Sequence, residues 1–380
     1  MRGTRRTSQL TATLATAIVG LLFLAGCSNT GHGQAQDAPQ QDLSEVEVLE
    51  DPRSYEGPST AVIPDAVIEP ITENPDQSLP TTVTSYTQAG GEEQIEITDT
   101  SRVVALDMAG SIAASIWALG FSDTLVGVDQ STTFAGTEDL ETVTSGGHTV
   151  NAEAIIGLAP DVVITDGSVG PRDVVEQLTD VGITVVFLEN ESSFDGAQNL
   201  IRQVAEVYGA PEVGEQLATQ TGQDIEDKIA QIAEIAPQDE DEKVRMLFLY
   251  LRGNAGVYYM FGSESGADDL ISALGGVDVA KELGWEGMKP MTDEALVAAD
   301  PDLILTMSGG IESVDGIEGL LEEKPAVAIT TAGENQRIVD MEDGQILSFG
   351  PRSADVLDAL ARAVYAPESA DAARAAQGNE

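Results

Sequence analysis

A short internal repeat places the strongest limit on how this chain can fold. Residues 151–165 read NAEAIIGLAPDVVIT and residues 292–306 read TDEALVAADPDLILT, and they align without a gap at an offset of 141 residues. Each copy has the pattern of a short helix, a Pro-Asp break and a buried strand. Because proline cannot continue a helix, the chain turns there directly into a sheet. The repeat therefore predicts two similar α/β lobes.

Short β-branched, apolar runs alternate with helical stretches along the chain, which is the pattern of βαβ units. Because the runs are apolar on both faces, they indicate buried and mainly parallel strands. Period-two alternation over 82–86 and 94–98, joined around Gly90-Gly91, predicts a hairpin before them. The predicted strands cover residues 102–106, 161–164, 184–188, 246–250, 302–305 and 337–339.

One long helix is predicted between the two lobes, from Pro211 to Ala236. Pro211 fits the first turn of a helix, and Pro237 ends the run. A helix of this length extends about 39 Å, which is enough to cross a lobe. A single rigid connecting helix permits only small opening motions between the lobes.

The first residues of the chain have the pattern of an export signal. A basic start precedes an apolar run over 10–25, which is shorter than the roughly 20 consecutive apolar residues of a spanning helix. The sequence Leu-Ala-Gly-Cys at 24–27 resembles the lipobox of bacterial lipoproteins, in which the cysteine becomes the lipidated first residue. We therefore expect residues 1–26 to be a signal peptide. We expect Cys27 to anchor the mature protein to the outer side of the cell membrane.

The next fifty residues have the composition of a tether. Seven of the 16 prolines lie between Pro39 and Pro80, and eleven acidic residues but only one basic residue, Arg53, lie between 37 and 76. Proline and like charge favour an extended chain, although apolar residues from Tyr55 to Ile68 could cover a lobe. The predicted segments are a signal peptide at 1–26, a tether at 27–80, an N-terminal lobe at 81–209, a connecting helix at 210–237 and a C-terminal lobe at 238–380.

Composition and motifs exclude several classes of function. The 65 acidic and 18 basic residues give a net charge of -47, which argues against binding to nucleic acid. One cysteine excludes an intrachain disulfide and a cysteine-based zinc site. No GxxxxGK[ST], HExxH, GxSxG or GxGxxG motif is present, and only His148 and His32 could serve a catalytic triad. We therefore predict that the chain is not an enzyme.

Residues at the ends of the predicted strands are the candidates for binding a ligand. In open α/β sheets, ligands bind beyond the carboxyl ends of the strands. Asp107-Met108 and Asp166 follow strands of the first lobe, and Tyr250 and Met307 end strands of the second. His148 lies on a glycine-rich loop just before the first repeat helix, so we expect it to face the same cleft.

Together these features resemble the class III solute-binding proteins of bacterial ABC importers, which serve iron siderophores, cobalamin and haem. The resemblance covers roughly residues 81–365. Within that family, the sequences SGGH at 145–148, LYLRG at 249–253 and AGVYY at 255–259 closely resemble the haem-binding HmuT lipoproteins of actinobacteria, as does PRSY at 52–55.

The resemblance implies a fold and a function. The fold is α/β, with two similar lobes that have mainly parallel central sheets and are joined by one long α-helix. The ligand is haem b, carried non-covalently in the cleft between the lobes by a monomer. The partner is an ABC permease dimer with its ATPase, which takes up the haem for its iron.

The lobes then offer an imidazole, His148, and a phenol, Tyr250, as the two axial ligands of a haem iron. Arg252 lies two residues after Tyr250 on the same strand face and could hydrogen-bond the phenol oxygen. A cation there favours the phenolate, the form that binds ferric iron strongly. Further candidates are Met307, Met288, Met291, Tyr258 and Tyr259 against the porphyrin face and Arg252, Arg337 and Arg352 for the propionates.

Each of these residues also has an ordinary structural explanation. A histidine on a glycine loop is often a hydrogen-bonded surface residue, and a tyrosine at a strand end is often a core residue with its hydroxyl at the rim. Arg252 could pair with a carboxylate, and the methionines could fill the core. The alternatives for function are a ferric siderophore or cobalamin carrier of the same fold, a hydrolase, and a structural surface lipoprotein.

Glu153 and Glu294 occupy equivalent positions in the two copies of the repeat. A carboxylate early in a helix complements the positive helix N-terminus, which alone would explain both residues. The resemblance implies a second role, in which the two glutamates dock onto arginine pockets of the permease dimer. Two similar lobes fit such a partner, because each lobe meets one of its subunits.

Overall fold

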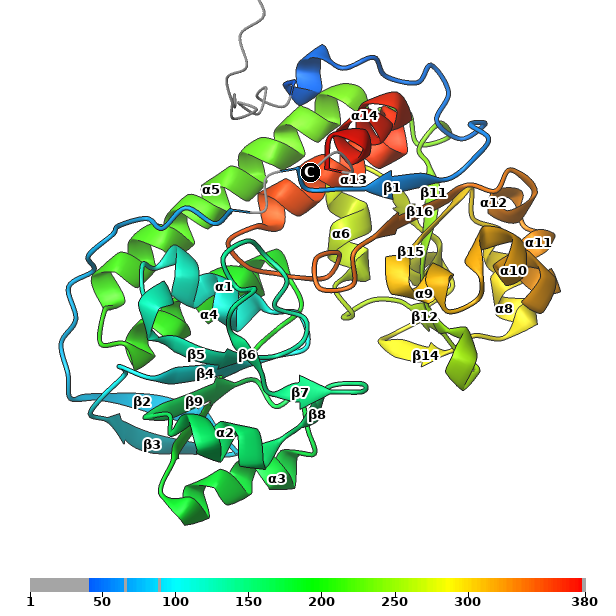
Figure 1. The fold of residues 1–380 in the computed structure, drawn as a ribbon. Coiled ribbons are helices and arrows are strands. Elements are labelled where there is room, and N and C mark those ends of the chain that lie inside the picture. The colour runs from blue at the N-terminus through cyan, green and yellow to red at the C-terminus, as the bar shows by residue number, and fades with distance from the viewer. Residues whose placement is uncertain (1–40, 65–66, 88–89, 378–380) are drawn as a thin grey trace, which may run out of the picture. The chain divides into compact units, whose positions relative to one another are not determined.

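Each half of the chain builds its own central sheet, as the repeat predicts (Figure 1). The computed structural model describes residues 41–64, 67–87 and 90–377. The predicted signal peptide, Cys27 and His32 lie outside the described residues. The first sheet has the order β10-β9-β4-β5-β6 with parallel pairs throughout. Its strands are β4 (Val103–Leu106), β5 (Leu125–Val128), β6 (Glu141–Thr142), β9 (Val162–Thr165) and β10 (Thr184–Phe187).

The second sheet has the order β1-β16-β15-β11-β12-β14, and β13 also pairs with β11. The pairs among β1, β16, β15, β11 and β13 are parallel, whereas β12 and β14 add an antiparallel edge. The predicted fold class is therefore confirmed in both lobes. The strands are β1 (Ser59–Ala61), β11 (Arg245–Arg252), β12 (Val257–Phe261), β13 (Val277–Asp278), β14 (Met288–Pro290), β15 (Leu303–Met307) and β16 (Ile338–Met341).

Both faces of each sheet are covered by helices, which explains why the strand runs are apolar throughout. In the first lobe, Val103 and Ala105 pack towards α1 (Ser111–Ala118) and α4 (Phe194–Val207), while Val104 packs on the opposite face. Apart from the long connecting helix, the other α-helices of the described residues are α2 (Ala152–Leu158), α3 (Arg172–Glu176), α6 (Ala267–Ala273), α7 (Val279–Glu282), α8 (Asp293–Ala299), α9 (Ser308–Glu312), α10 (Gly316–Glu323), α11 (Pro325–Ala328), α12 (Thr331–Glu334), α13 (Ser353–Tyr365) and α14 (Pro367–Gln377).

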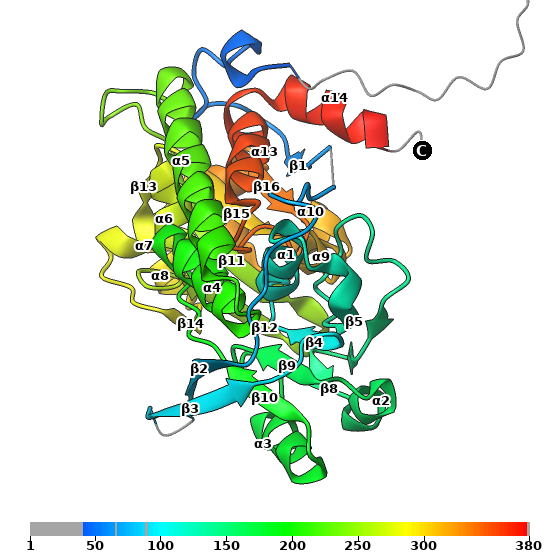
Figure 2. The same ribbon diagram turned by 90° about the vertical axis from the view of Figure 1, so that its left-hand side faces the viewer.

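The predicted connecting helix is α5, which spans Pro211–Ile235 and has proline in its first turn. Its apolar stripe contributes Leu217 to the core of the first lobe and Ile225 to the core of the second. The helix packs along α4 and α13 (Figure 2). Lys228 of α5 forms an ion pair with Asp358 of α13 at 2.7 Å. The prediction of one helix shared by both lobes is confirmed.

The two copies of the repeat build the same helix-to-strand connection. The side chains of Asn151 and Thr292 cap α2 and α8 by accepting backbone N–H groups at 3.1 and 3.2 Å. At the other end, Ala159 and Asp300 adopt the left-handed backbone conformation, with φ of 48° and 39°. A left-handed residue closes a helix, and the following proline directs the chain into the strand.

The aspartate of each Pro-Asp pair fixes the start of the neighbouring strand. Asp161 accepts the backbone N–H of Arg102 at 2.9 Å, and Asp302 accepts that of Arg245 at 3.0 Å. Both guanidinium groups return to the end of the repeat helix, where Arg102 donates to the carbonyl of Leu158 and Arg245 to that of Ala299. The repeat thus ties a helix end to a strand start twice, which accounts for the shared register of its two copies without a functional argument.

The segment before the first lobe differs from the predicted tether. A hydrogen-bonded strand, β1, adds to the edge of the second sheet beside β16. Leu43, Val46, Ala61 and Ile63 are buried in the core of the second lobe. Arg53 forms an ion pair with Asp302 at 2.8 Å. Spaced apolar residues therefore anchor an acidic, proline-rich segment that composition alone makes an extended linker. The packing of β1 agrees with the prediction that apolar residues from Tyr55 to Ile68 could cover a lobe.

The predicted hairpin is confirmed as the antiparallel pair β2 (Thr81–Tyr86) and β3 (Glu92–Ile97). It packs against the first lobe, where the hydroxyl of Ser85 accepts the backbone N–H of Phe187 at 3.0 Å. In the part of the chain that the structure describes, no helix combines the length and apolar character needed to cross a bilayer.

Candidate ligand-binding site

The carboxyl edge of the first sheet carries an aspartate after each of three neighbouring strands. Asp107 follows β4, Asp129 follows β5 and Asp166 follows β9. Asp107 is fully buried and accepts the backbone N–H groups of Ser111 at 2.7 Å and Ile112 at 3.2 Å. Burial, and secondly the charge of Asp166, raise its pKa to about 8. The first two of these carboxylates are set into the protein rather than presented to solvent.

His148 lies on the turn of a small hairpin formed by β7 (Thr144–Ser145) and β8 (Thr149–Val150). Gly146, Gly147 and His148 all have positive φ, at 45°, 86° and 63°. The ring nitrogen Nδ1 lies 3.0 and 3.1 Å from the two carboxylate oxygens of Asp129. The His148 side chain is 20% exposed, whereas that of Asp129 is fully buried.

Asp129 was missed by sequence reasoning because the strand before it, β5, was not among the predicted runs. The signal is a short run, Leu-Val-Gly-Val at 125–128, that ends in an aspartate. Burial raises the pKa of this carboxyl. Hydrogen bonds from His148, the backbone of Ser131 and the hydroxyl of Thr144 together lower the pKa by more, so the net shift is downward.

In the second lobe, the structure gathers several predicted residues on one face of the sheet. Tyr250 lies directly opposite Tyr259, and Met288 lies opposite Phe261. Side chains two residues apart on a strand share a face, so these residues point to the same side. Tyr250, Tyr259 and Met307 all pack against the same core cluster, and the rings of Tyr250 and Phe261 are 6.0 Å apart.

Tyr258 differs from this arrangement, because it points to the opposite face of the sheet. Its hydroxyl donates to Glu323 at 2.7 Å, and the ammonium group of Lys324 lies 3.8 Å from its ring centroid. Burial, and then hydrogen bonding to Glu323, raise the pKa of Tyr258 to about 12. Met291 packs on the same far side. The structure therefore does not bring Tyr258 or Met291 together with Tyr250.

Arg252 makes different contacts from the predicted hydrogen bond to the phenol oxygen. Its guanidinium carbon lies 4.8 Å from the centroid of the Tyr250 ring, as in a cation–π contact. The same guanidinium forms an ion pair with Asp343 and donates to the carbonyl of Leu251 at 2.8 Å. One of its nitrogens also lies 3.9 Å from the sulfur of Met307. The charge stands beside Tyr250, but a carboxylate partly neutralises it.

Arg337 is excluded as a ligand for an acidic group by its position. It precedes β16 and so lies at the amino ends of the parallel strands, whereas Tyr250 lies near the carboxyl end of β11. The side chain of Arg337 is fully buried. Its guanidinium donates to the hydroxyl of Ser59 at 2.9 Å and to two carbonyls of α13. Burial lowers its pKa to about 10. Arg352, by contrast, lines a small cavity together with Gly110 and Ser131 of the first lobe.

The loop from Glu342 to Arg352, between β16 and α13, links the two lobes. Thr133 donates its hydroxyl to Glu342 at 3.3 Å, and the hydroxyls of Ser111 and Ser348 lie 3.2 Å apart. Burial raises the pKa of Glu342. The loop that holds Arg252 through Asp343 therefore also contacts the loop that carries Asp129.

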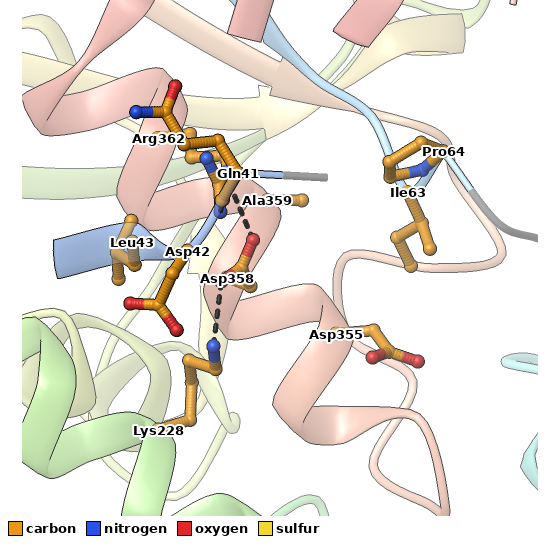
Figure 3. Close-up of a pocket in the computed structure, with 10 residues that line it drawn as sticks. All are labelled: Gln41, Asp42, Leu43, Ile63, Pro64, Lys228, Asp355, Asp358, Ala359 and Arg362. Carbon is orange, nitrogen blue, oxygen red and sulfur yellow. Dashed lines mark hydrogen bonds and ion pairs between the residues drawn. The ribbon is translucent and has the colours of Figure 1, made fainter. Parts of the chain in front are cut away.

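A cavity of about 260 Å³ lies away from these strand ends, where the N-terminal segment meets α5 and α13 (Figure 3). Its charged groups are already paired, with Asp358 bonded to Lys228 at 2.7 Å and to Arg362 at 2.6 Å. Burial raises the pKa of Asp355 beside them. None of the predicted site residues lines this cavity.

The described residues contain no group of three or more His, Cys, Asp or Glu side chains that could hold a bare metal ion. The predicted ligands His148 and Tyr250 come from different lobes. They suit a metal that already has other ligands and needs only axial ones.

Glu153 and Glu294 are both exposed, on α2 and α8. Three residues further along each helix lies an exposed aliphatic side chain, Ile156 at 45% and Val297 at 43%. These two residues are also equivalent in the repeat. Each lobe therefore presents a carboxylate and an aliphatic group on one helix face.

Residues 103–343 match a family model described as periplasmic binding protein. The chain is 28% identical over 254 residues to an uncharacterized ABC transporter substrate-binding lipoprotein, YvrC, of Bacillus subtilis. That match covers 66% of this chain and 76% of the relative. This chain is also 28% identical over 267 residues to a cobalamin-binding protein of Halobacterium salinarum, and that match covers 70% of this chain and 69% of the relative.

The fold also resembles solved structures of the heme binding protein HmuT. One has a TM-score of 0.76 and 39% identity, and the match covers 83% of this chain and 99% of that one. Three further matched structures are alanine variants of that protein, in which an arginine, a histidine or a tyrosine is replaced. In that protein the arginine lies two residues after the tyrosine.

Proposed function

Because this chain belongs to the periplasmic binding protein family, we propose that it binds haem between its two lobes and delivers it to an ABC importer. Proteins of this family are binding components of transporters, so the prediction that the chain is not an enzyme holds. One observation carries the choice of haem. His148, Tyr250 and Arg252 are the same three residue types that are replaced in the HmuT variants, and the arginine lies two residues after the tyrosine in both proteins.

His148 and Tyr250 are the proposed axial ligands of the haem iron. Nδ1 of His148 is engaged by Asp129, which leaves Nε2 as the nitrogen for iron. Tyr250 binds as phenolate, and the guanidinium of Arg252 beside its ring stabilises that anion. The Arg252–Asp343 pair is about one-third exposed on both sides, and such pairs contribute little. Arg252 can therefore turn towards the phenol oxygen when the ligand binds.

Soft apolar side chains are the proposed contacts for the porphyrin ring. Met307 and Tyr259 share the face of Tyr250, and Met288 is 55% exposed on the edge strand beside them. Met108 of the first lobe, 50% exposed, follows Asp107 at a strand end. Thioether and aromatic groups suit a flat apolar ligand. The haem is b-type, because covalent attachment needs a CxxCH motif and the chain has one cysteine.

We place the protein outside the cytoplasm, held to the membrane by a lipid on Cys27, with residues 1–26 removed as a signal peptide. Glu153 and Glu294 are its proposed contacts with arginines of a permease dimer. The exposed Ile156 and Val297 beside them would fill apolar positions of the same interface. The charge of -47 suits a partner with basic pockets.

The test is titration of the purified protein with hemin, followed by the Soret band. We expect a shift that saturates at one haem per chain, and no shift would contradict the proposal. Cobalamin is the second candidate, because one relative is a cobalamin-binding protein. A parallel titration with cyanocobalamin should give no saturable binding, and tight binding there would replace haem as the ligand.

A further inference from the structure

Asp129 is a fully buried carboxylate that lies beside His148 at the site. We propose that it is the positioning residue of His148: it holds the imidazole so that Nδ1 carries the proton and Nε2 points free towards the haem iron. The role of Nε2 as an iron ligand rests on the proposed function, whereas the position of the proton on the ring does not. Its basis is the hydrogen-bond network around the carboxylate.

An ionised carboxylate can only accept hydrogen bonds, and the donors around Asp129 point towards it. The backbone N–H of Ser131 donates to Oδ1 of Asp129 at 2.8 Å. The backbone N–H of Gln130 donates to the hydroxyl of Thr144 at 2.9 Å, and that hydroxyl donates to Oδ2 of Asp129 at 2.7 Å. Both carboxylate oxygens are thus acceptors, so the bond to Nδ1 of His148 requires a proton on that nitrogen.

The other ring nitrogen is left without a protein partner. Among residues 41–64, 67–87 and 90–377, no hydrogen bond to Nε2 of His148 is found. The side chain is 20% exposed, so part of the ring reaches the surface of the lobe. A neutral imidazole with Nδ1–H has its lone pair on Nε2, the atom that binds a metal.

The backbone conformation at this turn points to a second role of Asp129, which is to hold the orientation of the imidazole ring. His148 has φ of 63°, a conformation that costs a non-glycine residue free energy. Its carbonyl accepts the N–H of Gly170 at 3.2 Å, and the ring bond to Asp129 is its other tie to the lobe. The turn glycines before it leave no side chain that could hold the ring. Asp129 therefore fixes both the tautomer and the orientation of the imidazole.

The first experiment needs no ligand. The chain has two histidines, so ¹⁵N-histidine NMR of the His32→Ala protein reports His148 alone. At pH of about 8.5, where a free imidazole is neutral, we expect the Nδ1–H tautomer. In Asp129→Asn, the new amide donates towards Nδ1, and we expect the Nε2–H tautomer instead. An unchanged tautomer in Asp129→Asn would overturn the inference.

The second experiment uses the iron–histidine stretching band in ferrous haem, measured in Tyr250→Phe so that His148 is the ligand. A carboxylate on Nδ1–H increases the donor strength of the ring, and loss of such a partner lowers metal affinity about 10- to 100-fold. We expect Asp129→Asn to lower both the band frequency and the ferrous haem affinity. Thr144→Val, which keeps the carboxylate but removes one of its donors, leaves more negative charge on Asp129 and should therefore raise the band frequency by a small amount.

Asp278→Asn is the matched control, because Asp278 is also a buried carboxylate that accepts backbone N–H groups, in the other lobe. It should change neither the NMR signal nor the band. A band that stays in place in Asp129→Asn contradicts the inference. A wild-type protein that binds no hemin contradicts the proposed function instead, while the NMR result still decides the state of His148.

Discussion

The first lobe holds its candidate iron ligand through a buried carboxylate, whereas the second lobe presents its ligand from a strand beside a half-exposed ion pair. Nδ1 of His148 is bonded to Asp129, whose side chain is fully buried. Tyr250 stands on β11, where Arg252 is 30% and Asp343 35% exposed. A buried network is rigid, and an exposed pair can rearrange. The comparison suggests that the histidine is set before haem arrives and that the tyrosine side adjusts.

The lobes also differ in how completely the repeat is used. Asp161 binds only the start of its neighbouring strand, while Asp302 at the same position also binds Arg53 of the N-terminal segment. The second lobe thus includes chain from before the first lobe. An equivalent pair of residues can serve one connection in one lobe and two in the other.

The largest effect is expected on haem uptake, from the two glutamates that occupy equivalent positions in the two lobes. Replacing both repeat glutamates, in Glu153→Ala with Glu294→Ala, should abolish haem uptake by cells while hemin titration of the purified protein stays unchanged. The reason is that both carboxylates are exposed on helices and neither lies at a strand end. Uptake is measured as growth on haem as the iron source.

Glu212→Ala is the control for this experiment, because Glu212 is an exposed glutamate in the first turn of α5 but outside the repeat. It should leave uptake unchanged. Ile156→Ser with Val297→Ser should reduce uptake partially, through the aliphatic half of the same surface. Normal transport by the double glutamate variant would leave those residues only their helix-dipole role.

The second prediction separates the two axial ligands. Tyr250→Ala should weaken ferric haem binding on the order of 100-fold or more, since losing one partner of a buried charge pair costs about 3–5 kcal/mol. His148→Ala should cost less, because a neutral imidazole adds only a dative bond. Arg252→Ala should fall between wild type and Tyr250→Ala, because Arg252 acts through the phenolate. Hemin titrations decide the order.

Reduction of the iron sharpens this test. Ferrous iron binds phenolate less strongly than ferric iron does, so His148 should become the better partner after reduction. Spectra of the three variants in both oxidation states measure the change. Full ferric affinity in Tyr250→Ala would remove Tyr250 as a ligand.

The third prediction compares the stability contributed by the repeat aspartates. Asp302→Asn should lower the free energy of unfolding by roughly 1–3 kcal/mol, since it weakens charge-assisted bonds to Arg53 and the backbone of Arg245. Asp161→Asn, which affects one strand start, should cost less. Urea unfolding of both variants measures the difference, and equal losses would mean that Arg53 contributes nothing.

The last prediction concerns pH and the buried acid of the first lobe. Burial and the charge of Asp166 raise the pKa of Asp107 to about 8. The folded protein therefore holds a proton that the unfolded chain, with an ordinary carboxyl, releases between about pH 4 and 8. Stability from this group falls as pH rises through that range. Asp107→Asn should flatten the dependence, and an unchanged unfolding curve from pH 5 to 8 would contradict the assignment.

The sequence itself determined the architecture, because the elements that define it carry strong local signals. The repeat encodes a helix end and a strand start in fifteen residues, and its caps and breaks act within that span. Pro211 and Pro237 delimit the connecting helix, which runs to Ile235. The ligand candidates His148 and Tyr250 could be selected for the same reason, since strand ends and glycine loops are local features.

Tertiary structure decided what those side chains contact. Arg252 is two residues from Tyr250 on the strand, yet its partner Asp343 lies 91 residues away. Asp129 and His148 are 19 residues apart and meet only because β5 ends beside the β7–β8 hairpin. The acidic segment before residue 80 packs because the second lobe provides a free strand edge for β1 and an apolar core for the buried side chains of the segment. Local pattern fixes where an element begins and ends, whereas pairing depends on which distant surfaces folding brings within hydrogen-bond reach.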